Sequence, residues 1–508
     1  MGPLTGSVAG GDVRLVAAAC SAVDEQQQRI MEEVGKDANC TVQLNFGRTF
    51  PSGLYRAVQR IHEREGYEVE CYFDFDLPRI EPDLVTPDLL AGFTLREHQI
   101  RIIKKMLNRR RGHCNASTGC GKTLCILAIA VLALREHGHR TLVIAGSKGT
   151  ANQIATVFRD VCGDGINIGF IGDGRKNVGD ITVAVRDTLN KCMPSAGGKF
   201  ANPEYERVYR YITEGAQRVM IDECQTTGAD RLYDTLQCCP ALQKLGFSGT
   251  PMVHRRLRDL KVLAATGPEL VRVGSEELVA LGLQAFPKIA VVADPAIYPS
   301  SLLREHLDRN RGRRQNPWES IRIRKYRETY AAFYLENPHH NEKLVVGSAL
   351  WFASRKLPTL VLCRRMEQHA KLLDLFAESG VPFEAVSGKT KIPDRNAAKA
   401  RLSEGKIMVL LASDIFSRGE DMPACRGLVL AEGVKGFENC MQRIGRAMRA
   451  KDTGTNEAWV IDTSPPTSSM LEKHAAARIS AYRRAGYAVQ VFPKFDMKLI
   501  EAFFESRK

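Results

Sequence analysis

The stretch Cys114-Asn115-Ala116-Ser117-Thr118-Gly119-Cys120-Gly121-Lys122-Thr123-Leu124 has the pattern of a phosphate-binding loop. Glycine has no side chain, so Gly119 and Gly121 let the backbone curl around a phosphate group and point its N–H groups inward. Lys122 brings a positive charge to the β- and γ-phosphates, and the hydroxyl of Thr123 is a suitable ligand for Mg²⁺. The pattern departs from its strict form at Ala116, where a glycine usually stands. We expect the nucleotide to contact Ala116, Ser117, Thr118, Gly119, Cys120, Gly121, Lys122 and Thr123.

The segment after the loop alternates between helix-like and strand-like runs. Residues 124–134 are apolar and rich in helix formers, which predicts a buried helix whose positive N-terminal end faces the phosphates. The alternation predicts a mostly parallel sheet with helices on both faces, and ligands collect at the carboxyl ends of such strands. The predicted strands are 141–145, 181–185, 219–221 and 245–247, with a helix at 152–160.

Asp222 and Glu223 come directly after the apolar strand 219–221. Adjacent residues of a strand point to opposite sides, so we expect Asp222 to hold Mg²⁺ while Glu223 orients or deprotonates the attacking water. Residues 248–250 also follow a strand, where small hydroxyl side chains could sense the γ-phosphate. Ahead of the loop, Gln99 precedes an amphipathic helix at 100–108 and carries an amide that can read the edge of adenine.

A second alternating block begins near residue 346 and contains no phosphate loop. In the predicted helix 442–449, Gln442, Arg446 and Arg449 are spaced i, i+4 and i+7, so they lie on one face and would point together at a phosphate. Arginine suits this role because its fork stays charged and binds phosphate oxygens in pairs. Gly419 and Asp421 are further expected nucleotide contacts. The block's predicted strands are 359–363, 383–386, 406–412, 427–430 and 458–461, with a helix at 367–378.

Composition indicates the kind of partner. The 508 residues carry a net charge of +14, which favours a polyanion and most simply nucleic acid. A dense basic run over residues 304–327, with Trp318, Tyr326 and Tyr330 near it, suits phosphate contact with base stacking, although a solvated helical face is the ordinary alternative.

The fourteen cysteines show no metal-binding spacing and are typical of reduced thiols in an intracellular protein. No apolar run is long enough for a membrane span, so we expect a cytoplasmic protein, in the host cytoplasm if viral.

The motifs, in this order, resemble those of superfamily 2 helicases: Gln99, the loop at 116–123, Asp222-Glu223-Cys224-Gln225 and Ser248-Gly249-Thr250. The resemblance implies an α/β fold with two RecA-like parallel-sheet motor domains in tandem, which use ATP and Mg²⁺ in the cleft between them. The family usually has a histidine where Gln225 stands. Two N-terminal segments, 47–54 and 65–67, are similar to the accessory domain of phage UvsW-type recombination helicases, and XPB-like and RadD-like helicases are close in motif style.

These features predict four parts: an accessory α+β domain at 1–90, a first motor domain at 91–285, a basic connecting segment at 286–345 and a second motor domain at 346–508. Prolines at 78, 82 and 87 mark a linker after the first part.

The resemblance implies an ATP-dependent DNA helicase or translocase that acts on branched or duplex DNA, in branch migration or in fork or R-loop remodelling. Lys122, Glu223, Arg446 and Arg449 are then the catalytic residues, Thr123 and Asp222 the metal ligands, and single-strand-binding or recombination proteins are potential partners. An RNA helicase and the motor subunit of a restriction system remain alternatives. A non-enzymatic binding module is also considered, but the intact Lys122, Asp222, Glu223 and Arg446 argue against it.

Overall fold

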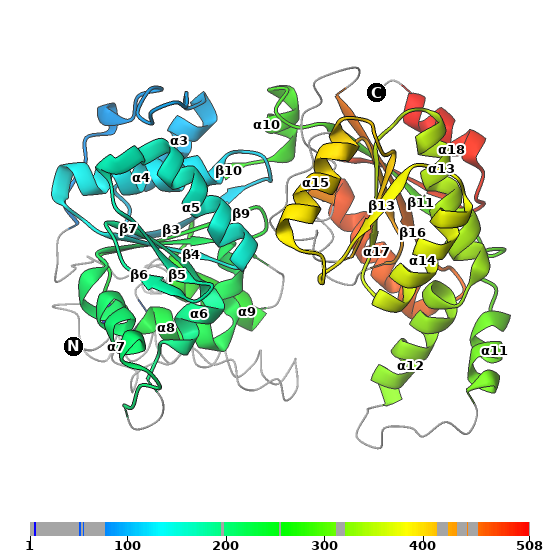
Figure 1. Ribbon diagram of the computed structural model, residues 1–508, viewed down its shortest axis with the longest axis horizontal. Coiled ribbons are helices and arrows are strands. Elements are labelled where there is room, and N and C mark those ends of the chain that lie inside the picture. The colour runs from blue at the N-terminus through cyan, green and yellow to red at the C-terminus, as the bar shows by residue number, and fades with distance from the viewer. Residues whose placement is uncertain are drawn as a thin grey trace, which may run out of the picture. The chain divides into compact units, whose positions relative to one another are not determined.

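The computed structural model describes residues 5–6, 50–51, 54, 77–194, 198–252, 256–310, 321–413, 425–433, 444–445 and 456–506. The chain divides into two compact units, Met1–Gly274 and Ser275–Lys508. Each unit contains one large sheet with helices packed on its faces (Figure 1). This arrangement agrees with the predicted α/β fold class.

The sheet of the first unit has the strand order β10-β3-β9-β8-β4-β7-β5-β6 among the described residues. All its neighbouring strands are parallel except β5 and β6, which pair antiparallel at one edge. Its strands are β3 (Arg111–Ala116), β4 (Thr141–Ala145), β5 (Ile168–Gly172), β6 (Arg175–Asn177), β7 (Ile181–Val185), β8 (Arg218–Asp222), β9 (Gln243–Ser248) and β10 (Glu269–Val273). Its helices are α3 (Glu97–Met106), α4 (Lys122–His137), α5 (Lys148–Cys162), α6 (Arg186–Lys191), α7 (Pro203–Arg210), α8 (Asp230–Gln237) and α9 (Arg256–Thr266).

The central strands of this sheet are buried on both faces, which explains their continuous apolar sequences. Leu142 and Ile144 of β4 join the core cluster that also contains side chains of α6, α7, α8 and α9. Val143, between them in sequence, is buried as well but lies outside that cluster, because successive side chains of a strand point to opposite faces. Helix α4 is buried along Cys125–Ala133, as the apolar run after the phosphate loop predicted.

The sheet of the second unit is parallel throughout its described strands, in the order β13-β14-β12-β15-β16-β11-β17. Its strands are β11 (Phe286–Val292), β12 (Thr359–Cys363), β13 (Phe383–Val386), β14 (Val409–Ser413), β15 (Gly427–Leu430), β16 (Glu457–Thr463) and β17 (Ala488–Phe492). Its helices include α10 (Ser275–Ala280), α11 (Ser301–Arg309), α12 (Ile321–Tyr330), α13 (Gly347–Ser354), α14 (Met366–Glu378), α15 (Ile392–Ser403), α17 (Ser469–Arg484) and α18 (Met497–Glu505), with the π-helical turns η6 (Ala331–Leu335) and η7 (His339–Val346).

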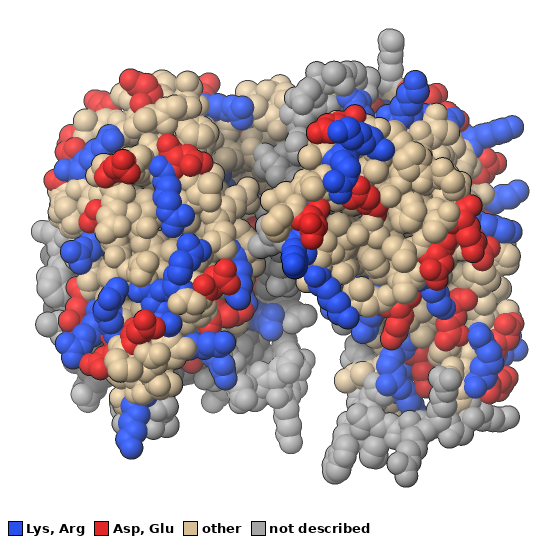
Figure 2. Space-filling model, viewed as in Figure 1, with Lys and Arg blue, Asp and Glu red and all other residues tan. Residues whose placement is uncertain are grey.

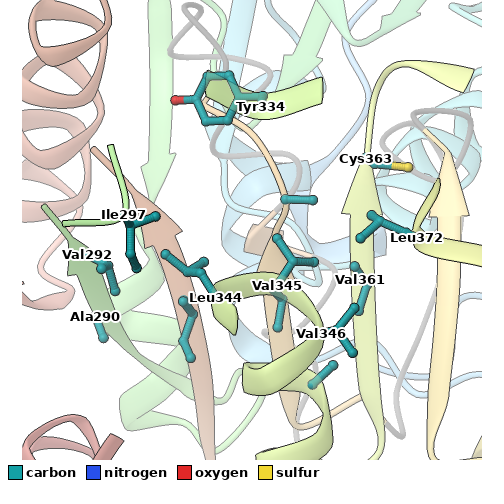
Figure 3. Close-up of a cluster of buried hydrophobic side chains, with 14 of the residues drawn as sticks. Ala290, Val292, Ile297, Tyr334, Leu344, Val345, Val346, Val361, Cys363 and Leu372 are labelled. Carbon is teal, nitrogen blue, oxygen red and sulfur yellow. The ribbon is translucent and has the colours of Figure 1, made fainter. Parts of the chain in front are cut away.

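Alternate residues of β12 serve two separate cores. Leu360 and Leu362 belong to one cluster, whereas Val361 and Cys363 belong to the other. Figure 3 shows the second cluster, where Val361 and Cys363 lie among side chains from β11, α14 and the turns η6 and η7. The sheet is therefore covered on both faces, as an all-parallel sheet requires.

Two expectations about the segments between domains differ from the structure. Residues 286–345 were expected to connect the domains, but β11 lies inside the second sheet, paired with both β16 and β17. Its apolar sequence therefore belongs to a core rather than to a linker. The proline-rich segment before residue 90 is also packed: Ile80 is buried, and its backbone N–H and C=O both bond to the side chain of Asn108, at 2.9 and 2.8 Å.

Most of the expected accessory domain lies outside the described residues. Within it, Thr5–Gly6 pairs antiparallel with Phe50–Pro51, and Leu54 is buried in the core of the first unit. A search of the described helices finds none with the length and apolar character needed to cross a membrane.

Candidate nucleotide-binding site

The phosphate-binding loop connects β3 to α4, between the last strand residue Ala116 and the first helical residue Lys122. Gly119 and Gly121 have φ angles of +91° and +83°. This left-handed region strains residues that have a Cβ atom, so these two positions favour glycine for a physical reason. The loop ends at the N-terminus of a long buried helix, where unpaired N–H groups and the helix dipole favour an anion.

The side chain of Lys122 folds back onto its own loop. Its Nζ donates to the carbonyl of Ala116 at 2.9 Å and to that of Ser117 at 3.4 Å. Burial would lower the pKa of Lys122, but the nearby carboxylates of Glu223 and Asp222 outweigh it and the pKa is raised. The lysine is therefore a firmly charged ammonium group beside the loop, which suits it to bind phosphate oxygens.

Asp222 is the last residue of β8, and Glu223 begins a left-handed turn with φ +56° and ψ +56°. The expectation that Glu223 continues the extended strand of Asp222 is wrong, because the chain turns at Glu223. A turn at Glu223, followed by the 3-10 helix η5 (Cys224–Gly228), sets the direction of its side chain instead. Such a conformation costs a non-glycine residue on the order of 1–2 kcal/mol, and strain of this kind clusters at functional sites.

The buried Gln225 bridges Glu223 to the end of β9. Its Nε2 donates to Glu223 Oε2 at 2.8 Å, and its Oε1 accepts from the Ser248 hydroxyl at 2.6 Å. The N–H of Thr250 in turn donates to Ser248 Oγ at 2.9 Å. An amide can act as donor and acceptor at once, so glutamine links a carboxylate to a hydroxyl where the family usually has histidine.

The loop at residues 248–250 also lies against the phosphate-binding loop. A Cβ atom added to Gly249 would stand 3.2 Å from the Ala116 carbonyl oxygen and 3.7 Å from the Thr118 nitrogen. From the other side, Ser117 N–H donates to the Val273 carbonyl at the end of β10, at 3.0 Å. Three neighbouring strands thus bring their carboxyl ends to one place, as expected for a parallel sheet.

Gln99 lies in the first turn of α3 and contacts the phosphate-binding loop directly. Its Oε1 accepts from the Arg96 N–H at 2.9 Å, and its Nε2 donates to the Cys120 carbonyl at 3.2 Å. The neighbouring His98, which was not among the predicted site residues, places Nε2 3.0 Å from the same carbonyl. Both side chains are almost fully buried. The only sequence signal for His98 is its position beside Gln99 ahead of the loop.

The proposed metal ligands offer hard oxygen donors. Burial and the adjacent Glu223 raise the pKa of Asp222 despite the opposing effect of Lys122. A carboxylate in that condition gains from a further cation, and carboxylate and hydroxyl oxygens are donors that Mg²⁺ accepts. Thr123, half-buried in the first turn of α4, supplies such a hydroxyl. The chemistry of Asp222 and Thr123 therefore fits Mg²⁺.

The candidate residues of the second unit lie outside the described residues. They are Gly419, Asp421, Gln442, Arg446 and Arg449, so their roles remain predictions. Much of the basic run, including Arg311, Arg313, Arg314 and Trp318, also lies outside.

The described aromatic side chains of the basic run pack within the second unit. Tyr330 is 5% exposed, and its ring lies 5.1 Å from that of Tyr334. The ring of Tyr326 lies 5.9 Å from Tyr330 and 5.7 Å from His474. Base stacking by the buried Tyr330 is therefore ruled out, and the exposed side chains of α12 include the charged Lys325 and Arg327 and the apolar Ile321 and Ile323.

Two family models match the chain. The model of the type III restriction enzyme res subunit matches residues 92–253, and the helicase conserved C-terminal domain matches residues 343–451. The first match includes the phosphate-binding loop, Asp222, Glu223 and residues 248–250. Helicase 22 of Sulfolobus islandicus filamentous virus is 24% identical over 386 residues, which make up 73% of this chain and 64% of that protein. The chain thus spans less than two thirds of that relative.

Solved structures share the fold. S. cerevisiae Dbp5 bound to RNA and ADP BeF3 matches with a TM-score of 0.54 and 13% identity, over 82% of this chain and 95% of that one. The type ISP restriction-modification enzyme LlaBIII bound to DNA also has a TM-score of 0.54, with 12% identity, over 86% of this chain and 33% of that one. T4 UvsW is 21% identical, with 88% of each chain covered and a TM-score of 0.35. The first two likenesses confirm the two RecA-like domains.

Proposed function

Because the chain belongs to superfamily 2 of the helicases, we propose that it is an ATP-dependent DNA helicase or translocase acting on branched or duplex DNA. Branch migration and the remodelling of forks or R-loops, in recombination, replication or repair, are reactions that suit such a motor. One observation carries the proposal: Lys122 lies beside Asp222 and Glu223, and the Gln225–Ser248 pair bonds to Glu223 at the same sheet edge.

Each predicted site residue of the first unit has a role in the proposed reaction. The loop N–H groups and Lys122 bind the ATP phosphates, and Gln99 reads the base. Glu223 orients the attacking water or accepts its proton. Asp222 and Thr123 would hold Mg²⁺, which supplies positive charge to the phosphate oxygens. Arg446 and Arg449 of the second unit would stabilise charge on the γ-phosphate.

Coupling to motion is proposed to run through Gln225. Gln225 bonds to both Glu223 and the Ser248 hydroxyl, so a change in the hydrogen bonds of Glu223 would move the Gln225 amide and with it the Ser248 hydroxyl. Because the Thr250 N–H donates to that hydroxyl, the backbone of residues 248–250 would respond to the state of the nucleotide. This gives the glutamine the same linking role that the usual histidine would have.

Net charge, surface charge and fold similarity bear on the choice between DNA and RNA. The net charge of +14 favours a nucleic acid without choosing between DNA and RNA. On the face shown in Figure 2, Lys and Arg are spread over both units and interspersed with Asp and Glu. The fold similarity to Dbp5 bound to RNA makes an RNA helicase the second candidate, and the similarity to LlaBIII keeps the restriction motor as a third.

A steady-state ATPase measurement with Mg²⁺ tests these candidates. The panel consists of one sample without nucleic acid and four samples that contain single-stranded DNA, duplex DNA, a four-way junction or RNA of matched length. We expect the strongest stimulation by junction or duplex DNA. Stimulation by RNA alone would identify the protein as an RNA helicase and not a DNA motor. An ATPase rate near zero in every sample would contradict its assignment as an enzyme.

Two variants test whether the measured ATPase rate comes from the candidate nucleotide-binding site. Lys122→Ala should abolish turnover by weakening phosphate binding. Glu223→Gln should lower kcat by about a hundredfold or more while the enzyme still binds ATP, since general-base catalysis contributes about that much. The exposed Glu136→Gln on the same helix as Lys122 makes the same charge change away from the site and should leave kcat unaltered.

A further inference from the structure

The peptide group between Cys120 and Gly121 is held by two side chains of α3. Its carbonyl oxygen lies 3.0 Å from Nε2 of His98 and 3.2 Å from Nε2 of Gln99. Both side chains are 2–3% exposed, so water does not compete with these bonds. A carbonyl oxygen can only accept, so the His98 contact requires a proton on Nε2.

The direction of this carbonyl also sets the direction of a donor in the loop. The two ends of a planar trans peptide, C=O and N–H, point in opposite directions. With the Cys120 carbonyl turned toward α3, the N–H of Gly121 points away from α3. No acceptor for that N–H is found among the described residues. It is a donor left for the phosphate groups that such a loop binds.

Gln99 cannot keep its hydrogen bond to the Cys120 carbonyl in every orientation of its amide if the same amide also contacts the base. Its Oε1 already accepts from the Arg96 N–H, and its Nε2 lies only 2.0 Å from where a Cβ of Gly121 would stand. Turning the Gln99 amide toward a purine would therefore disturb its bond to the Cys120 carbonyl. The His98 bond to the same oxygen does not depend on the base.

We propose that His98 is a positioning residue of the nucleotide site, which keeps the Gly121 N–H directed at the phosphates whichever way the Gln99 amide turns. This inference rests on the proposed ATP-binding function and deepens it. It divides the work of two adjacent side chains: His98 supports phosphate binding for any nucleotide, and Gln99 supplies base selectivity.

Dissociation constants for ATP and GTP, measured by calorimetry on the full chain, test this division. His98→Leu keeps the bulk and removes the donor, and it should weaken ATP and GTP equally, by about tenfold, the upper part of the range for one hydrogen bond. His98→Gln restores a terminal N–H donor and should recover most of the affinity. Gln99→Ala should instead reduce the ratio of ATP to GTP affinity.

Three results would overturn the inference. They are unchanged affinity in His98→Leu, equal losses in His98→Leu and His98→Gln, or a changed ATP-to-GTP ratio in His98→Leu. If the wild type binds neither nucleotide, the proposed function itself fails.

A measurement on the unaltered chain covers the case in which His98→Leu does not fold. In ¹⁵N-histidine spectra, with the His98 signal assigned by its loss in His98→Gln, the ring should carry a slowly exchanging proton on Nε2. A neutral ring protonated only on Nδ1 could not donate to Cys120 and would contradict the assignment.

Discussion

At the scale of single residues, Gly121 combines two separate requirements for glycine. Its φ is +83°, and a Cβ atom would stand 2.0 Å from Gln99 Nε2. Gly138, at the other end of α4, has φ +66° but no atom within 4 Å of its added Cβ. Comparing substitutions at Gly138 and Gly121 therefore separates two free-energy costs of an added Cβ: the strain of a left-handed backbone, and the steric clash with Gln99.

We predict that Gly138→Ala costs about 1–2 kcal/mol of stability, the usual cost of placing Cβ in this conformation, without changing ATP affinity. Gly121→Ala should cost more, because it also displaces Gln99, and should weaken ATP binding. Urea denaturation and nucleotide titration measure the two effects. Equal behaviour of the two variants would show that Gln99 adapts to the extra atom without loss.

A second residue-scale prediction concerns Lys244, a buried lysine at the start of β9. Its Nζ donates to the Leu236 carbonyl at 2.7 Å, and it forms no ion pair with any described residue. Burial, with a smaller effect from Arg111, lowers the pKa of Lys244 from 10.5 to about 7. The unfolded chain therefore binds one more proton than the folded chain between about pH 7 and pH 10.

The free energy of unfolding should rise with pH across that window, by up to about 1.4 kcal/mol per pH unit for one proton. Lys244→Met should flatten the rise, and the exposed Lys104→Met should not. Urea unfolding followed by circular dichroism at pH 7, 8 and 9 measures the slopes. Parallel profiles for the wild type and Lys244→Met would mean that Lys244 stays fully protonated in the fold.

At the scale of elements, α12 is one of the two helices that carry described residues of the basic run, and α11 is the other. Arg324, Lys325 and Arg327 extend from this helix, while Tyr330 anchors it in the core of the second unit. Lys325 and Arg327 are exposed and Arg324 is partly exposed. A cationic helix with a rigid base suits contact with phosphate groups.

Replacing Arg324, Lys325 and Arg327 with glutamine should weaken duplex DNA binding at low salt. It should also reduce the slope of log K against log salt concentration by up to about 3, since each phosphate contact contributes about 0.9. ATPase activity without DNA should not change. Arg483→Gln with Arg484→Gln, at the exposed end of α17, is the control. An unaltered slope in the α12 variant would leave this helix as a solvated face.

At the scale of the whole molecule, the two units can be observed separately. The chain has three tryptophans, Trp318, Trp351 and Trp459, and all belong to the second unit. The phosphate-binding loop belongs to the first unit. Tryptophan fluorescence therefore reports unfolding of the unit that does not contain the loop.

A non-hydrolysable ATP analogue with Mg²⁺ should raise the calorimetric transition of the first unit, because a ligand stabilises the state that binds it. If Arg446 contributes to the site, the fluorescence transition of the second unit should rise as well. Arg446→Ala should remove the second shift and keep the first. A fluorescence transition that does not respond to the analogue in the wild type would argue against any contribution from Arg446.

The local features of this protein follow directly from its amino-acid sequence. The glycines of the phosphate-binding loop, the buried helix after it and the central strands follow from residue type and periodicity over a few neighbours, and the predicted strands at 141–145, 181–185, 359–363, 383–386 and 427–430 agree with β4, β7, β12, β13 and β15. The resemblance of its motifs to those of superfamily 2 helicases implied two tandem motor domains.

Which distant segments meet became evident only from the folded chain. It placed β11 in the second sheet, turned Glu223 out of its strand, linked Gln225 to Ser248 and brought His98 to the Cys120 carbonyl. These contacts depend on strand pairing and burial between residues far apart in the chain, and on hydrogen bonds that form only after packing excludes water. Local periodicity carries no information on any of them, because it is the same whichever partner a segment finds.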